Sequence, residues 1–338
     1  MLLALIMTLG ALAQQPVTWE IRHGAADGSS LPALIVTTHT ATTRLDLQVN
    51  CGGVQRSYPG GTNPGEAVRL EFKLPPGTHN CSGNLEGVFV DGSEGTAPLS
   101  FQVKAPRALS LSYTKSDLDL KARTMSVRSN HPIDRVEIEV FGPNGTPLGS
   151  GVAPADRGSL GPHKLQWTQS PGEVVQIRLI AHGELGEAYS LDLWPWSYQV
   201  PHEDLNFATG SHEVTPAEAT KLQPAMDKIR TVLEKYGRGV GGQPIPIHLY
   251  VAGYTDTVGS AASNKALSQR RARSIAQWFR ANGFNKPIFI QGFGEQGLIR
   301  PTADEVDDPA NRRALYMLSA MPPATSALIP DDRWKALD

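Results

Sequence analysis

Residues 253–272 read GYTDTVGSAASNKALSQRRA, and this stretch decides how the C-terminal third of the chain folds. It directly follows the run IPIHLYVA, in which alternate side chains are apolar. This alternation predicts a strand with one buried face. The turn VGS lets the chain reverse, and the residues that follow have the apolar spacing of an amphipathic helix. A strand that leads directly into a helix is typical of an α/β domain.

The segments on either side complete this domain. Thr215 is a good N-cap, Pro216 suits the first helical position and Glu218 completes a capping box, so we expect a helix from there to Gly237. KPIFIQGFGEQ and RRALYMLSA predict two later strands. The resulting order, β-α-β-α-β-β over residues 204–320, predicts a mixed sheet with helices on one face. The helical residues that should face the sheet are Leu222, Met226, Ile229, Leu233, Ala272, Ile275 and Phe279.

The first two thirds of the chain have a different pattern. Short alternating runs such as ALIVTT, LDLQVN and VVQIRLIAHG are separated by turn clusters rich in the chain's 33 glycines and 26 prolines. We predict N-terminal all-β, sandwich-like domains at residues 17–104 and 107–198, the second with a hairpin turn at EVFGPNGTPLG. One elongated β unit is the alternative that the sequence leaves open. The Pro- and Ala-containing tail, residues 321–338, should be flexible.

The N-terminus and the two cysteines predict export. Residues 1–13, MLLALIMTLGALA, have the short apolar run and the small-x-small ending of a signal peptide. No cysteine follows, so we expect a periplasmic protein that is not a lipoprotein. No other run approaches the ~20 apolar residues of a membrane span, so we expect no transmembrane segment in the mature chain. Cys51 and Cys81 predict one structural disulfide, worth ~3 kcal/mol, and two free buried thiols are the alternative.

Asp256 and Arg271 are the candidate functional pair. Asp256 follows the predicted strand, at the carboxyl end where α/β folds usually place ligand sites. Asn264 and Arg271 are seven residues apart, which puts them near one helix face, with Leu267 between them. The acid and the guanidinium could form a structural salt bridge, half of a catalytic site, or a grip for a ligand that carries both charges.

Short motifs in one order extend this candidate site. They are FATGSHEVTP, GYTDTVGS, Asn264, LSQRRA, GFGE and NRR at residues 311–313. Together they resemble the OmpA-like (OmpA/MotB C-terminal) peptidoglycan-binding family over residues 204–320. The resemblance implies non-covalent binding of the peptidoglycan stem peptide at its diaminopimelate residue. The principal contacts that it implies, the Asp of the TD motif and the Arg of the LSxxRA motif, fall on Asp256 and Arg271.

The residue chemistry agrees with this implication. The side-chain end of diaminopimelate carries an ammonium and a carboxylate. Asp256 can accept a hydrogen bond from the ammonium, and Arg271 can donate a bidentate pair of hydrogen bonds to the carboxylate. We expect Leu267 to pack against the methylenes of the stem peptide. The remaining candidate ligand-binding residues are Thr255, Asn264, Asn311 and Arg312. Asn311 and Arg312 could instead close a turn and pair with the acidic run at residues 304–308.

Other function classes are less well supported by the sequence. The net charge of −2 gives no indication of a nucleic-acid partner. The adjacent residues of HED, at 202–204, rarely converge on one metal ion, so we expect no metal, cofactor or catalytic residue. A flagellar stator would need an N-terminal membrane helix and a porin would need membrane strands, and neither pattern is present. The alternatives that stay open are a peptidoglycan-processing enzyme and a structural envelope scaffold whose Asp256–Arg271 pair is only a salt bridge. We expect the β domains to engage an envelope protein or to act as spacers.

Overall fold

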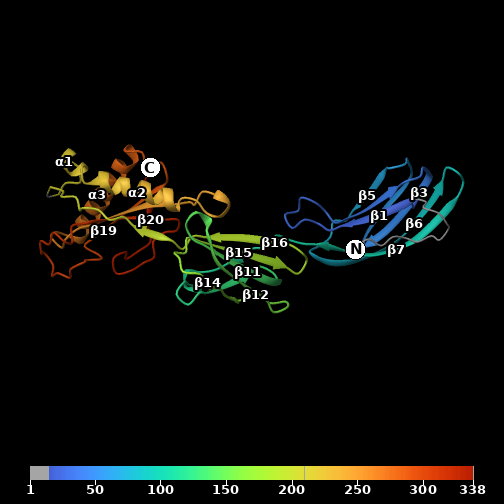
Figure 1. Ribbon diagram of the computed structural model, residues 1–338, viewed down its shortest axis with the longest axis horizontal. Coiled ribbons are helices and arrows are strands. Elements are labelled where there is room, and N and C mark those ends of the chain that lie inside the picture. The colour runs from blue at the N-terminus through green and yellow to red at the C-terminus, as the bar shows by residue number, and fades with distance from the viewer. Residues whose placement is uncertain (1–14, 209, 338) are drawn as a thin grey trace. The chain divides into compact units, whose positions relative to one another are not determined.

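The computed structural model describes residues 15–208 and 210–337 and divides into two compact units (Figure 1). The first unit comprises residues 15–137, Val152–Gln166 and Ile180–Ser190, and the second comprises Ile138–Gly151, Trp167–Leu179 and residues 191–337. The predicted signal peptide at residues 1–13 lies outside the described residues. Within the described ranges, no helix is long and apolar enough to cross a membrane.

Two antiparallel sheets form the N-terminal part of the first unit. One has the order β1-β2-β5, with β1 at Val17–Arg22, β2 at Ala33–Thr38 and β5 at Ala67–Glu71. The other has the order β4-β3-β6-β7, with bounds Val54–Thr62, Thr42–Cys51, Gly77–Phe89 and Glu94–Ala105. Alternate side chains of both sheets meet in one apolar core, because successive residues of a strand point to opposite faces. The predicted disulfide is confirmed: Cys51 and Cys81 lie opposite one another on β3 and β6 and are bonded.

Two further sheets follow along the chain. One has the order β13-β10-β8, with β9 paired to β10, and the other has the order β14-β12-β11-β15-β16. The predicted hairpin turn is present between β11 and β12, where Asn144 and Gly145 both have positive φ, as an Asn-Gly turn requires. The all-β character of residues 17–199 is therefore confirmed, while its division into domains at 17–104 and 107–198 stays a prediction. The strand bounds are β8 Leu111–Ser112, β9 Leu118–Asp119, β10 Thr124–Ser129, β11 Ile133–Phe141, β12 Pro147–Pro154, β13 His163–Gln166, β14 Thr168–Gln169, β15 Gln176–Gly183 and β16 Ala188–Leu193.

The C-terminal α/β fold is a mixed sheet in the order β17-β20-β18-β19-β21. Strands β18 (His248–Tyr254) and β19 (Ile288–Gly294) run parallel and are joined by helix α3 (Ala261–Ala281), while β20 (Ala314–Ser319) pairs antiparallel to β18. Helices α2 (Leu222–Tyr236) and α3 pack their apolar stripes against one face of this sheet, as predicted. The stripe residues with almost no exposed surface are Leu222, Met226, Ile229, Ala272, Ile275 and Phe279.

The first predicted helix is divided in two. Thr215 caps α1 (Pro216–Ala219) by accepting a hydrogen bond from the backbone N–H of Glu218, but α1 ends after one turn and α2 starts at Leu222. Pro224 explains the break, because its ring would clash with the carbonyl of residue 220 in a continuous helix. The capping box is also incomplete: the Glu218 carboxylate accepts from the backbone N–H of Asn206, at 2.7 Å, rather than from the N-cap.

The two ends of the domain differ from their predicted bounds. The first strand, β17 (Ser197–Gln199), lies before residue 204 and pairs with β20. The predicted flexible tail instead packs against the sheet face opposite the helices, where β21 (Lys335–Ala336) pairs with β19. Trp334 and Ile329 join the apolar cluster on that face, which includes Tyr254 and Phe293. The apolar side chains of the tail therefore cover sheet residues that would otherwise face water.

Candidate functional site

Glycines bring α3 unusually close to the sheet at the site. A Cβ at Gly253 would overlap the carbonyl oxygen of Ser268, and a Cβ at Gly292 would overlap the backbone of Gln269. The GYTD and GFGE motifs therefore have a packing reason for glycine, because only a residue without a side chain allows this approach. As a result Ser268 is fully buried, and its hydroxyl accepts from the backbone N–H of Gly294 at 2.8 Å.

Asp256 lies just beyond β18 and forms its ion pair with Arg312, not with Arg271. Its Oδ2 is 2.5 Å from Nη1 of Arg312, and the Asp256 residue is 7% exposed. The same Nη1 also pairs with the exposed carboxylate of Asp307. These two hydrogen bonds raise the pKa of the Arg312 guanidinium. The structure therefore does not contain the Asp256–Arg271 salt bridge that was the alternative interpretation.

The segment that precedes α1 holds the side chain of Arg271 in position. Its Nε donates to the carbonyl of Ser211 at 3.0 Å, and its guanidinium carbon lies 4.9 Å from the centre of the Phe207 ring. Arg271 is only 6% exposed. Burial lowers the pKa of its guanidinium, the neighbouring Arg312 lowers it further, and Asp256 opposes both effects. Arg271 and Arg312 line one pocket and Asp256 pairs with Arg312, so the three charges lie close together.

Asn264 and Asn311 support loops around the site. The side-chain amide of Asn264 donates to Glu295 Oε2 at 2.9 Å and to two carbonyls of the loop before α3. Asn311 is fully buried, accepts from the backbone N–H groups of Ile299 and Arg300, and donates to the Arg300 carbonyl. Both side chains thus hold backbone in place. Asn311 therefore closes a turn, and Arg312 pairs with Asp307 of the acidic run, as the alternative interpretation of these two residues predicted.

Thr255 and Leu267 flank the charged residues. Thr255 is 2% exposed, and among the described residues its hydroxyl has no hydrogen-bond partner. Leu267 is half-buried on α3, between Asn264 and Arg271. Thr255 directly precedes Asp256, Leu267 lies one helical turn before Arg271, and their role as ligand contacts stays a prediction.

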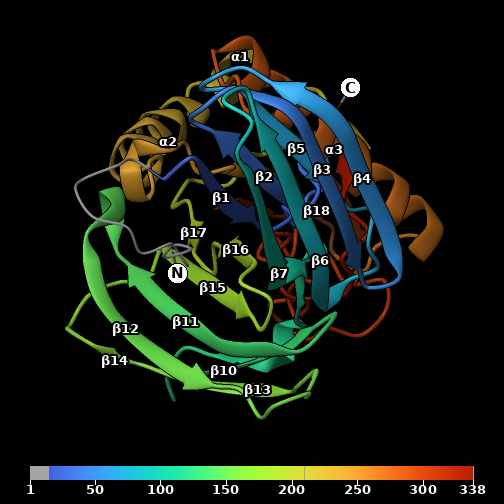
Figure 2. The same cartoon turned by 90° about the vertical axis from the view of Figure 1, so that its right-hand side faces the viewer.

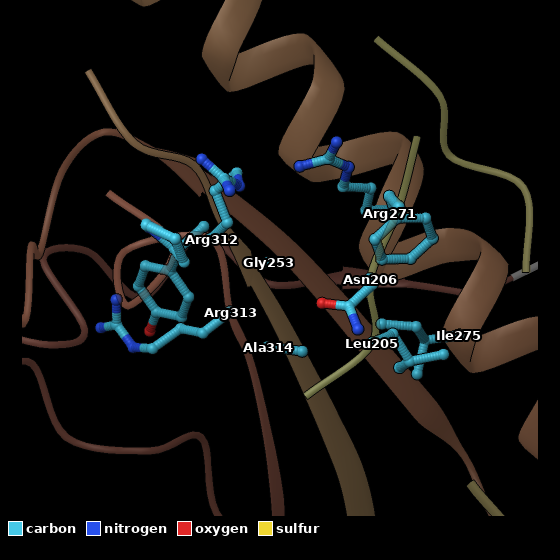
Figure 3. Close-up of a pocket in the computed structure, with 11 residues that line it drawn as sticks. Leu205, Asn206, Gly253, Arg271, Ile275, Arg312, Arg313 and Ala314 are labelled. Carbon is cyan, nitrogen blue, oxygen red and sulfur yellow. The ribbon is translucent and has the colours of Figure 1, made fainter. Parts of the chain in front are cut away.

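A pocket of about 180 Å³ lies between these groups, and Figure 3 shows its lining. Arg271 comes from α3 on one side, and Arg312 comes from the segment before β20 on the other. Arg313 packs its guanidinium 3.9 Å from the centre of the Tyr254 ring and completes a cationic lining. The remaining lining residues are Leu205, Asn206, Phe207, Gly253, Ile275, Pro309 and Ala314.

The pocket wall formed by residues 205–207 was not predicted from the sequence. Phe207 is the first residue of the FATG motif. The motif was recognised in the sequence, but the contact of the Phe207 ring with Arg271 was not predicted. Asp307 was also not singled out, although the acidic run that contains it was. Around the pocket, two guanidiniums (Arg271 and Arg312) thus stand with two carboxylates (Asp256 and Asp307). With Arg313, three guanidiniums and two carboxylates surround the pocket, and a set that contains both signs suits a ligand that carries both signs.

The HED segment has a structural place in the fold. The His202 ring stacks on Tyr316 with centres 3.8 Å apart, and its Nδ1 bonds to the carbonyl of Val200. Asp204 accepts from the backbone N–H of Ala314 at 3.3 Å. In the part of the chain that the structure describes, no group of three or more His, Cys, Asp or Glu side chains could hold a metal ion.

Comparison with known proteins identifies the C-terminal domain. Residues 206–312 match the OmpA family. Outer membrane protein A of Buchnera aphidicola subsp. Schizaphis graminum is 30% identical over 100 residues, which cover 29% of this chain and 26% of that protein. Outer membrane protein P5 of Haemophilus influenzae is 34% identical over 115 residues, which cover 34% of this chain and 29% of that protein.

A solved structure, the OmpA-like domain of FopA1 from Francisella tularensis subsp. tularensis SCHU S4, aligns with 15% identity and a TM-score of 0.27. The alignment covers 42% of this chain and 73% of that one. The family match confirms the resemblance predicted from the motifs. Both sequence matches cover less than a third of each relative, so they concern this domain alone.

Proposed function

Starting from an OmpA-family domain at residues 206–312, we propose that this domain binds peptidoglycan non-covalently through the diaminopimelate of the stem peptide. The observation that carries the proposal is that Asp256 and Arg271 belong to one charged site without bonding to each other. Among the described residues, Arg271 donates one hydrogen bond, from Nε to the Ser211 carbonyl. Both terminal nitrogens of the guanidinium are then available for a carboxylate.

The charge pattern fits the side-chain end of diaminopimelate. We propose that its ammonium joins Arg312 on the Asp256 carboxylate and that its carboxylate takes a bidentate pair of hydrogen bonds from Arg271. Arg312 keeps its second partner, Asp307, so the ammonium does not leave a guanidinium unpaired. Each ligand charge thereby meets an opposite charge in a partly buried site, where hydrogen bonds to charged groups are worth about 1.5–3 kcal/mol.

The location and the role of the β sheets belong to the same proposal. The disulfide between Cys51 and Cys81 suits an oxidising compartment such as the periplasm. We propose that the C-terminal domain tethers or positions the β sheets at the cell wall, where they bind an envelope protein or act as spacers.

Pull-down by purified sacculi tests the site assignment. The variants Asp256→Asn and Arg271→Gln should each lose at least about tenfold in bound fraction, because each removes one charged partner of the ligand. Arg270→Gln is the matched control, since Arg270 is the exposed neighbour of Arg271 on α3, and it should bind normally. Circular dichroism should show the same fold for all three variants. Normal binding by both site variants would refute the assignment.

The same incubation separates binding from catalysis. Non-covalent binding predicts that sacculi release no soluble muropeptides in the presence of the purified chain. Release of muropeptides by the wild type that Asp256→Asn abolishes would instead show that the site performs chemistry.

A further inference from the structure

The outer face of the four-stranded sheet in the first unit has a hollow of about 480 Å³ (Figure 2 shows β3, β4 and β6 side by side). Strand register places its polar side chains in two rows across these strands. Asn50 lies opposite Gln55 and Ser82, and Gln48 lies opposite Ser57 and Asn84. Val49, Arg56 and Gly83 complete the lining.

The polar side chains of the hollow are not used by the fold. Among the described residues, those of five exposed lining residues, Gln48, Gln55, Ser57, Ser82 and Asn84, make no hydrogen bond to another protein group. Asn50 differs, because its Oδ1 accepts from the backbone N–H of Gly53 at 3.1 Å. Four amides and two hydroxyls therefore face one hollow, and each of these groups both donates and accepts hydrogen bonds.

The lining of the hollow carries little charge. Arg56 is its charged lining residue, and the guanidinium is committed to the backbone, since it donates to the carbonyls of Glu71 and Gln55 at 2.9 Å. Asp46 and Glu86, which lie opposite each other one row further along the same face, are outside the lining. A phosphate or carboxylate ligand would therefore find one cation within the lining, and that cation already donates to two backbone carbonyls.

The frame around the hollow is fixed. The disulfide between Cys51 and Cys81 ties β3 to β6 at the pair of residues adjacent to Asn50 and Ser82. At Gly83 a Cβ would overlap the carbonyl oxygen of Gln48, so β3 and β6 approach closely there. Groups held in place before a ligand arrives bind it at a smaller entropic cost.

We propose that this hollow binds a neutral oligosaccharide. A sugar chain presents many uncharged hydroxyls, and its acetamido groups, where present, pair with side-chain amides in the way that two amides pair. A protein partner is a poorer match, because the centres of protein interfaces are largely apolar and the exposed side chains of this lining are polar. Nucleic acid would require several cations for its phosphates, and the lining contains one, Arg56. The proposal is independent of stem-peptide binding, since Arg271 belongs to the other unit.

Side-chain amide NMR of the full ¹⁵N-labelled chain tests this directly, with N-acetylchitotetraose and maltotetraose as the probes. Saturable shifts of the amides of Gln48, Gln55 and Asn84 with either sugar would support the proposal, and the sugar that causes them identifies the source. Asn80 and Gln102 provide an internal control, since these exposed amides of the same sheet bond to one another at 2.8 Å and lie outside the lining. Their signals should stay unchanged.

The double variant Gln48→Ala/Asn84→Ala should weaken sugar binding at least about tenfold, because two neutral hydrogen-bonding groups are lost. Its remaining backbone signals should match those of the wild type, which excludes unfolding as the cause. No shift with either sugar up to its solubility limit, or equal shifts of Asn80 and Gln102, would overturn the proposal.

Discussion

At the scale of single residues, Arg271 depends on its neighbours for its position. The Phe207 ring and the Ser211 carbonyl hold its guanidinium at the pocket, and both come from the segment before α1 rather than from α3. A buried cation over an aromatic face gains more from that contact than an exposed one does. We infer that Phe207 is a positioning residue for Arg271.

The variant Phe207→Leu should weaken binding of a diaminopimelate peptide about 3- to 30-fold, which corresponds to the loss of a partly buried cation–π contact. Isothermal titration calorimetry measures the change. Phe207→Tyr keeps the ring and should bind like the wild type. If Phe207→Leu bound as tightly as Phe207→Tyr, the ring would have no part in placing Arg271.

Sequence reasoning predicted where Asp256 and Arg271 lie but not their partners. The strand-to-helix pattern and the motifs bring both residues to one edge of the sheet, because they are local in the chain. The partner of Asp256 is Arg312, 56 residues later, and it arrives through the antiparallel pairing of β20 with β18. Choosing between Arg271 and Arg312 requires side-chain distances that no local pattern contains.

At the scale of secondary-structure elements, the tail corrects the prediction most clearly. The Pro and Ala residues of the tail predict flexibility, and the short strand β21 is too brief to give an alternating pattern. Two aromatic contacts nevertheless fix the segment: the Trp334 ring lies 5.1 Å from Tyr250 and 6.0 Å from Phe293, both edge-on. The tail also reaches the site, because the hydroxyl of Tyr254 donates to the carbonyl of Leu328 at 2.5 Å.

The variant Trp334→Ala should therefore lower the free energy of unfolding of the second unit by about 2 kcal/mol, somewhat less than a fully buried aromatic would cost. Urea denaturation of the full chain measures the change. Leu328→Ala is the control, since Leu328 is 40% exposed, and it should change stability by less than about 0.5 kcal/mol. Equal stability of Trp334→Ala and the wild type would mean that the tail is not docked in solution.

At the scale of the whole molecule, the amino-acid pattern predicted the fold classes better than the boundaries. Alternating strands and turn clusters distinguish residues 17–199 from the helical C-terminal domain, since periods of two and of 3.6 residues differ plainly. The start of the C-terminal domain was harder to predict. Val175 packs into the core of that domain, and Glu173 accepts hydrogen bonds from Trp196 and Tyr236. Such contacts depend on tertiary packing and leave no periodic signal in the sequence.

The central claim is that the C-terminal domain binds both charged groups at the side-chain end of diaminopimelate, the ammonium and the carboxylate. The most direct measurement is a calorimetric titration of the full chain with two stem peptides that differ only in carrying diaminopimelate or lysine. Lysine lacks the carboxylate that Arg271 should bind, so the lysine peptide should bind about 10- to 150-fold more weakly. Equal affinity for the two peptides would contradict the account.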